Sequence, residues 1–88
     1  MKTRRKENWR LNEGNKIFTP KSKTTIFINY SYPLHILEAQ FAEGKVYHYK
    51  DVEEELWAEY KSLVQAGGSS GIFINTRIKP YYDVEEIE

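Results

Sequence analysis

The sequence contains no cysteine, so disulfide bonds, thiolate metal sites and cysteine nucleophiles are excluded. No apolar run approaches the roughly 20 residues that a helix needs to cross a bilayer. The basic amino terminus lacks the apolar stretch of a signal peptide. The histidines, His35 and His48, have no third metal ligand at a suitable spacing. We therefore expect a cytoplasmic protein that holds no metal ion and no cofactor.

The net charge of zero conceals an uneven distribution of charge along the chain. Residues 1–23 contain eight Lys or Arg and two Glu, which is +6, whereas residues 24–88 contain five Lys or Arg and eleven Asp or Glu, which is −6. A basic arm on an acidic body predicts a polyanionic partner such as nucleic acid. The alternatives are a solvated tail and an arm docked on an acidic body. Partial docking is expected, because disordered tails seldom carry large apolar residues such as Trp9, Leu11, Ile17 and Phe18.

The middle of the chain predicts β-structure. Residues 24–30 are rich in β-branched and aromatic side chains, and residues 34–49 predict a β-hairpin with Gly44 at the end of its loop. A three-residue loop of this kind pairs Ala39 with Tyr47. That register places the tyrosines of the hairpin in the core rather than on a base-stacking surface. It gathers one apolar face: Ile26, Ile28, Tyr30, Leu37, Ala39, Phe41, Tyr47 and Tyr49.

A helix follows the hairpin. A capping box from Asp51 to Glu54 is expected to begin it, and Gly67-Gly68 is expected to end it. The later segment Ile72–Ile78 suits a short strand or a short helix, and its local pattern does not separate the two. The apolar positions of the first helix recur at helical spacing: Val52, Leu56, Trp57, Tyr60, Leu63 and Val64.

Two motifs stand on either side of this helix. The first is Leu37-x-x-x-Phe41 followed by Gly44 and Tyr47-x-Tyr49, and the second is Ser69-x-Gly71-x-Phe73-x-Asn75-x-x-Ile78. With these motifs, the sequence over about residues 25–82 resembles the KTSC domain. That family occurs at the C-terminal end of some lysyl-tRNA synthetases and as a stand-alone bacterial or phage protein. Val52-Glu53 departs from the usual Val-Pro, and the basic arm lies outside the family pattern.

The resemblance implies a three-stranded antiparallel β-meander followed by two helices packed on one face, which is an α+β fold. It favours a helix for residues 72–78. It brings no catalytic residues, and RNA binding is suggested for the family by its association with a synthetase. Fold alone does not establish that function. We expect a basic arm, partly docked, at 1–23, a KTSC-like domain at 24–82 and an acidic tail at 83–88.

The reverse face of the predicted sheet carries Phe27, Ile36, Val46 and His48, beside Glu38. This is more apolar than the solvated face of an antiparallel sheet usually is. Either the arm or a second subunit is expected to cover it. In a third alternative the face binds a ligand, and His48 and the basic arm meet a phosphate.

The leading hypothesis is a small non-enzymatic protein that binds nucleic acid, RNA in particular, through its basic arm. The alternative is an oligomeric protein-interaction module, phage-encoded in one version, which binds a host protein or sequesters a small anionic ligand. Its homo-oligomer would form through the reverse sheet face at Phe27, Ile36 and Val46. No membrane partner is expected. The expected nucleic-acid-binding residues are Arg4, Arg5, Lys6, Trp9, Arg10, His48 and Arg77.

Overall fold

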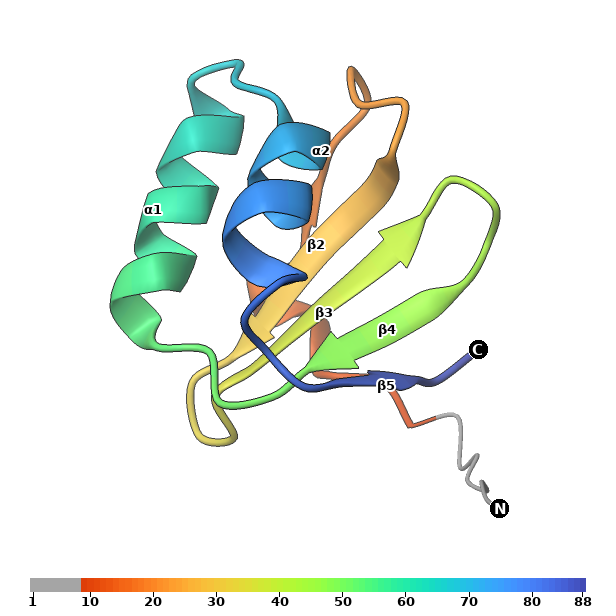
Figure 1. Ribbon diagram of the computed structural model, residues 1–88, viewed down its shortest axis with the longest axis vertical. Helices are drawn as coiled ribbons and strands as arrows, with labels where there is room; N and C mark the ends of the chain where they lie inside the picture. The colour runs from red at the N-terminus through yellow and green to blue at the C-terminus, as the bar shows by residue number, and fades with distance from the viewer. Residues whose placement is uncertain (1–8) are drawn as a thin grey trace.

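The computed structural model describes residues 9–88 of the chain. They form one antiparallel sheet in the order β1-β2-β3-β4-β5, with the helices packed on one of its faces (Figure 1). No helix in this range is long and apolar enough to cross a membrane. The elements are η2 (Glu13–Asn15), β1 (Ile17–Phe18), β2 (Thr25–Ser31), β3 (Ile36–Phe41), β4 (Val46–Tyr49), α1 (Glu54–Gln65), α2 (Ser70–Phe73), η3 (Ile74–Ile78) and β5 (Val84–Glu86).

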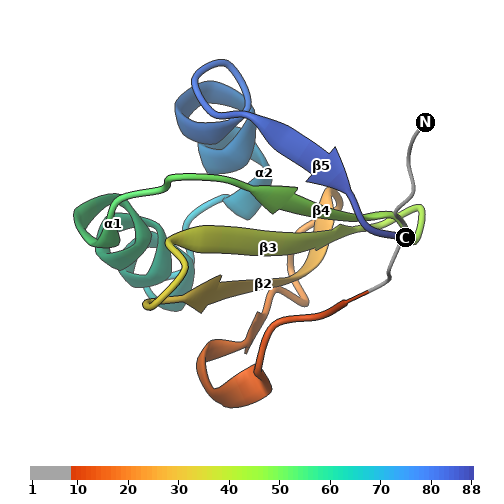
Figure 2. The same ribbon diagram turned by 90° about the horizontal axis from the view of Figure 1, so that it is seen from below.

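The predicted α+β class is confirmed, and β2, β3 and β4 form the predicted meander that precedes the helices. The predicted number of strands is too low, because β1 and β5 each add a short strand at an edge of the sheet (Figure 2). Such strands are too short to show an alternating pattern in the sequence, and pairing with β2 and β4 holds them in place. The segment expected as an acidic tail therefore contains β5 and the buried Ile87.

The predicted register of the hairpin is confirmed. Ala39 pairs with Tyr47 and Leu37 pairs with Tyr49. The backbone N–H of Phe41 donates to the carbonyl of Lys45 across the three-residue loop, at 2.8 Å. Gly44 has a φ of 104°, a conformation that a residue with a Cβ rarely adopts, so the loop requires glycine here. The loop therefore decides which side chains of the hairpin face the helices.

One predicted core residue, Ile26, lies outside the core. Ile28 and Tyr30 are buried on the helix-covered face as predicted, whereas Ile26 is 40% exposed. The pairing of β2 with β3 shifts register between Thr25 and Phe27, so a bulge at Ile26 interrupts the alternation of side chains. A strict two-residue period could not show this shift.

Aromatic rings form much of the core between the sheet and the helices. Tyr30 of β2 stacks on Trp57 of α1 with ring centroids 5.3 Å apart, and Tyr60 of α1 stacks on Phe73 of α2 at 4.4 Å. The predicted core position of the hairpin tyrosines is confirmed, since Tyr49 is buried and the half-buried Tyr47 packs against the same cluster. Burial of Tyr49 raises the pKa of its phenol to about 12.

The predicted capping box at the start of α1 is wrong. The helix begins at Glu54 after an N-cap residue, Glu53, whose side chain makes no capping hydrogen bond. Asp51 instead has a φ of 60° and turns the chain between β4 and the helix. The buried Val52 follows, and its N–H donates to the carbonyl of His35. Burial of Val52 thus takes the place of a side-chain cap in positioning the first turn.

The predicted end of α1 is confirmed. The helix ends at Gln65, and Gly67 follows with a φ of 91°. The N–H of Gly68 donates to the carbonyl of Leu63 at 2.8 Å, a bond that closes the last turn of the helix. A Cβ on Gly68 would lie 2.6 Å from Cγ of Leu63 and 2.9 Å from its carbonyl oxygen. Only glycine allows this close approach.

The structure resolves the ambiguity over residues 72–78 in favour of helix. α2 continues directly into η3, a π-helical turn, and ends at Ile78 just before Pro80. Ser69 caps the first turn, because its Oγ accepts a hydrogen bond from the N–H of Ile72 at 3.1 Å. At Gly71 a Cβ would lie 2.4 Å from Oγ1 of Thr24, so the serine-glycine motif brings this helix against the residues before β2.

Candidate functional site

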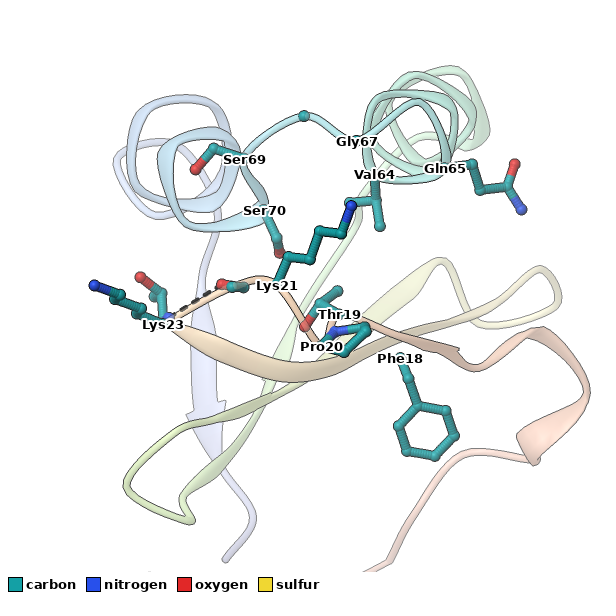
Figure 3. A pocket seen from close by; sticks show the side chains of 13 residues that line it. Phe18, Thr19, Pro20, Lys21, Lys23, Val64, Gln65, Gly67, Ser69 and Ser70 are labelled. Atoms are coloured by element: carbon teal, nitrogen blue, oxygen red, sulfur yellow. Dashed lines mark hydrogen bonds between the residues drawn. The ribbon is translucent and has the colours of Figure 1, made fainter.

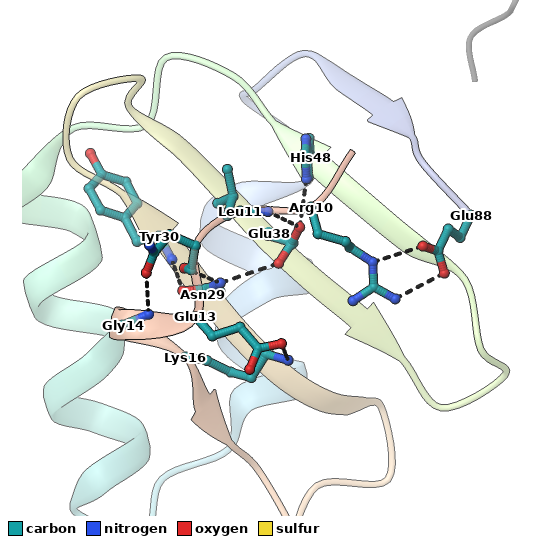
Figure 4. Close-up of polar contacts among 11 residues, drawn as sticks. Arg10, Leu11, Glu13, Gly14, Lys16, Asn29, Tyr30, Glu38, His48 and Glu88 are labelled. Carbon is teal, nitrogen blue, oxygen red and sulfur yellow. Dashed lines mark hydrogen bonds and ion pairs between the residues drawn. The ribbon is translucent and has the colours of Figure 1, made fainter. Parts of the chain in front are cut away.

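Residues 9–18 cross the reverse face of the sheet, on the side opposite the helices (Figures 1 and 4), and are called the strap below. Leu11 is the buried anchor of the strap. The Trp9 ring lies edge-on to the His48 ring of β4, with centroids 4.6 Å apart. At the other end, Phe18 of β1 contacts the Phe27 ring of β2 at 6.3 Å. Part of the basic arm therefore covers this face, which is one of the two covers expected from the sequence.

A buried carboxylate fastens the strap to the sheet. Glu38 of β3 is only 1% exposed, and it accepts hydrogen bonds from three donors (Figure 4). These are the backbone N–H of Leu11 at 3.0 Å, Nε2 of His48 at 2.8 Å and Nδ2 of Asn29 at 3.3 Å. Burial alone would raise the pKa of Glu38, but the hydrogen bonds outweigh burial and leave the pKa below its usual value. The ionised carboxylate is thus the form that the site stabilises.

The His48 ring is enclosed by this network. It is fully buried beneath Trp9, and its Nε2 carries the proton donated to Glu38. Nδ1 has no hydrogen-bond partner within residues 9–88. The expected contact of His48 with a ligand phosphate stays a prediction, and the burial of the ring means that the residues covering it would have to move first.

Other polar contacts hold the strap along its length. Nδ2 of Asn29 donates to the carbonyl of Asn12 at 3.1 Å, and Nδ2 of Asn15 donates to the carbonyl of Tyr30 at 3.0 Å. Arg10 forms a two-bond pair with Glu88, with both distances at 2.9 Å. The hydrogen bonds of this pair raise the pKa of the arginine and lower that of the carboxylate. The strap therefore connects β2, β3 and the end of the chain.

The apolar residues of the reverse face are largely buried, and the strap contacts Phe27 among them. Phe27 is 2% exposed and Val46 is fully buried, while Ile36 is half-buried. The Lys16 ammonium lies 4.1 Å from the centroid of the Phe27 ring, a cation–π contact that adds a charged cover. A homo-oligomer formed through these residues stays a prediction.

The expected nucleic-acid-binding residues are spread over separate parts of the molecule. Arg4, Arg5 and Lys6 lie outside the described residues. Trp9 and Arg10 lie on the strap, and Trp9 is 39% exposed. Arg77 lies on η3 and pairs with Glu59 of α1 through two bonds, at 2.7 and 3.0 Å. The structure thus brings Trp9, Arg10 and His48 near one another and places Arg77 apart from them, on the helix side.

A groove at the β1 edge of the sheet adds two residues that sequence reasoning did not single out, Lys21 and Lys23. Its volume is about 610 Å³, and it separates residues 18–24 from the α1–α2 connection (Figure 3). Its thirteen lining residues include both lysines and no Asp or Glu. The Lys-x-Lys spacing after Pro20 was visible in the sequence. Only the fold shows that, within residues 9–88, no carboxylate lines the groove.

No group of three His, Cys, Asp or Glu side chains within residues 9–88 is placed to hold a metal ion. The sequence pattern of the KTSC domain matches residues 21–82. A comparison with curated proteins found no match. The matched range contains the groove lysines, Glu38 and His48, whereas the strap precedes it.

Proposed function

The chain belongs to the KTSC domain family, and on that premise we propose that it is a small non-enzymatic protein that binds single-stranded nucleic acid, RNA in particular. The strap and the basic residues before it, Arg4, Arg5 and Lys6, form the binding surface. The observation that carries this proposal is the pair of exposed aromatic rings on a strap that is otherwise locked to the sheet. Phe18 is 63% exposed and Trp9 is 39% exposed.

Exposed rings beside cations suit single-stranded nucleic acid. Every base has a π-face that can stack on an aromatic side chain, and lysine or arginine next to the ring attracts the phosphates. The Lys16 ammonium lies 5.7 Å from the centroid of the Phe18 ring, and it also pairs with Glu13 at 3.1 Å. Arg10, next in sequence to Trp9, is itself paired with Glu88, so it contributes little free positive charge. Arg4, Arg5 and Lys6 extend the basic segment beyond the described residues.

A titration of the full chain with a fluorescently labelled 12-nucleotide oligouridylate tests the proposal. We expect binding at low salt, and the logarithm of the binding constant should fall linearly with the logarithm of salt concentration. F18A should weaken binding by roughly 5- to 150-fold, because a stacked base contributes about 1–3 kcal/mol. Replacement of Arg4, Arg5 and Lys6 with Gln should lower the salt slope by about 0.7 for each phosphate that the arm no longer neutralises.

Tyr81 provides the matched control, because it is another exposed ring, at 73%, and lies outside the strap. Y81A should bind the oligonucleotide like the unchanged chain. W9F keeps a ring over His48 and should retain most of the affinity if the ring stacks on a base. The proposal fails if the full chain has no measurable affinity for RNA or DNA at low salt.

A further inference from the structure

The groove at the β1 edge has features of a phosphate-binding site. That the phosphates belong to nucleic acid rests on the proposed function. We propose that Lys21 and Lys23 make it a binding site for phosphate groups. In the proposed function these groups belong to the backbone of a single strand that also contacts the strap. Phe18 lies at the junction, because it belongs to β1 and also lines the groove.

The electrostatic surroundings favour an anion. Residues 24–88 carry six more acidic than basic residues, yet none of the acidic ones lines the groove. By contrast, Glu53, Glu55 and Glu59 line a second hollow that includes Arg77. Lys21 and Lys23 form no ion pair with any residue of the range 9–88. No carboxylate within residues 9–88 therefore neutralises their charges, whereas Arg10 pairs with Glu88 and Arg77 pairs with Glu59.

The hydroxyl groups of the groove are arranged as donors. Oγ of Ser22 accepts hydrogen bonds from the backbone N–H groups of Thr24 and Thr25, at 3.0 and 3.1 Å. Oγ of Ser69 accepts one from Ile72 at 3.1 Å. Because these oxygens accept from the backbone, each hydroxyl proton can be donated to a ligand. Ammonium and hydroxyl donors without a carboxylate acceptor are the groups that phosphate oxygens require.

The floor of the groove is built before any ligand arrives. A chain of buried hydroxyl groups runs from Oγ1 of Thr19 to Oγ1 of Thr25 at 2.8 Å, then to Oγ of Ser70 at 2.9 Å and to the Tyr60 hydroxyl at 2.7 Å. Thr19 and Ser70 both line the groove. Burial raises the pKa of Tyr60 further above physiological pH. This series of hydrogen bonds joins the residues before β2 to α1 and α2, so it fixes the distance between the groove walls.

The groove also has the dimensions of a ligand site. A volume of about 610 Å³ lies within the range of roughly 300–1,000 Å³ that small-molecule sites occupy. It exceeds the needs of a single phosphate and leaves room for an attached sugar. Figure 3 shows Lys21 extending from the loop toward Val64 of α1, across the opening between the walls.

The test compares two double variants of the full chain that remove equal charge, K21Q/K23Q and K45Q/K50Q. Lys45 and Lys50 lie toward the other edge of the sheet, where they pair with Glu86 and Glu85 of β5. With the 12-nucleotide oligouridylate at low salt, K21Q/K23Q should weaken binding at least tenfold. It should also lower the salt slope by about 1.4, which corresponds to two phosphate contacts. K45Q/K50Q should change affinity less than threefold.

A second measurement separates the groove from the proposed function. In NMR titrations with the oligouridylate and with inorganic pyrophosphate, the amide signals of Gly67 and Gly68 should shift in the unchanged chain and stay in place in K21Q/K23Q. If these amide signals shift with pyrophosphate and not with the oligouridylate, phosphate binding in the groove is supported and nucleic-acid binding is overturned. Oligonucleotide binding that leaves these amides unmoved, with equal losses in the two double variants, would overturn the groove and leave the proposed function standing.

Discussion

Glu38 shows how one residue can join two distant parts of this chain. It occupies a position of β3 that faces away from the helices, where a charged residue would normally meet water. The strap instead buries it, and donors from Leu11, Asn29 and His48 replace the lost water. A buried carboxylate with this many partners stabilises the fold only while all of them stay in place. The residue therefore makes docking of the strap specific.

Substitution of Glu38 with Gln tests this role. The amide cannot accept as strongly from three donors, so E38Q should lower the free energy of unfolding by about 1–3 kcal/mol at pH 7. E43Q is the matched control, because Glu43 lies exposed in the hairpin loop, and it should unfold like the unchanged chain. Urea denaturation followed by circular dichroism measures both. Equal stability of E38Q and the unchanged chain would contradict the role given to Glu38.

The same variant predicts a pH dependence. Because the folded-state pKa of Glu38 lies below the usual value of 4.5, its carboxylate stabilises the fold above that value, and the stabilisation is lost as pH falls through the folded-state pKa. The difference in stability between E38Q and the unchanged chain should therefore shrink as pH is lowered below about 4.5. Denaturation curves from pH 7 to pH 3 measure the trend. A constant difference would show that ionisation of Glu38 does not matter.

At the scale of elements, the connection between α1 and α2 sets the geometry of the helix face and of the groove. Gly67 supplies the left-handed residue that ends α1, and Gly68 passes close to Leu63. Ser69 then begins α2 at once. The turn is short because two glycines permit it, and it places the next helix against the residues before β2.

Gly68→Ala should be destabilising, because its Cβ would lie 2.9 Å from the Leu63 carbonyl oxygen, a backbone atom that cannot move without opening the helix end. We expect a loss of about 1–3 kcal/mol, the range for overpacked sites. Gly14→Ala is the control, since the nearest atom there is a side-chain oxygen of Asn12 at 3.1 Å, and its effect should be small. Thermal denaturation compares the two, and a smaller loss for Gly68→Ala than for Gly14→Ala would contradict the packing argument.

On the scale of the whole molecule, the sheet is covered on both faces by its own chain. The helices cover one face, and Arg10, Lys16 and Phe18 of the strap lie against the Phe27 ring on the other. A small domain of this size buries a limited fraction of its surface, so the strap adds core that the central strands and helices could not supply alone. The second face is then available to partners mainly through the outer side of the strap.

We therefore expect the full chain to be a monomer of 10.5 kDa in light scattering. Deletion of residues 1–23 should expose Phe27, and the shortened chain should associate and bind a hydrophobic dye. A dimer that survives this deletion would instead favour the oligomeric interaction module. If the full chain is a monomer and the shortened chain is also a monomer that binds no dye, the strap does not act as a cover of the sheet.

Much of the fold was predictable because local chemistry specifies it. The loop glycine of the hairpin set the register, and the apolar period of α1 identified its buried face. For residues 72–78 the local pattern suited a strand or a helix, and only the resemblance to the KTSC domain favoured the helix. The bulge at Ile26 and the edge strands β1 and β5 were not predictable, because partners distant in sequence create them. The capping box predicted at Asp51 was wrong for a related reason, since burial of Val52, rather than a cap, positions the start of α1.

The sequence by itself determined the α+β class, the order of the central strands and helices, and the separation of a basic arm from an acidic body. Tertiary structure alone decided which polar groups are buried and which cations within residues 9–88 pair with a carboxylate of that range. It enclosed His48 and Glu38 beneath the strap, paired Arg10 and Arg77 with glutamates, and left Lys21 and Lys23 in a groove free of acidic residues. The physical reason is that solvation and pairing of charge depend on neighbours in space, which lie as many as 78 positions apart in this chain.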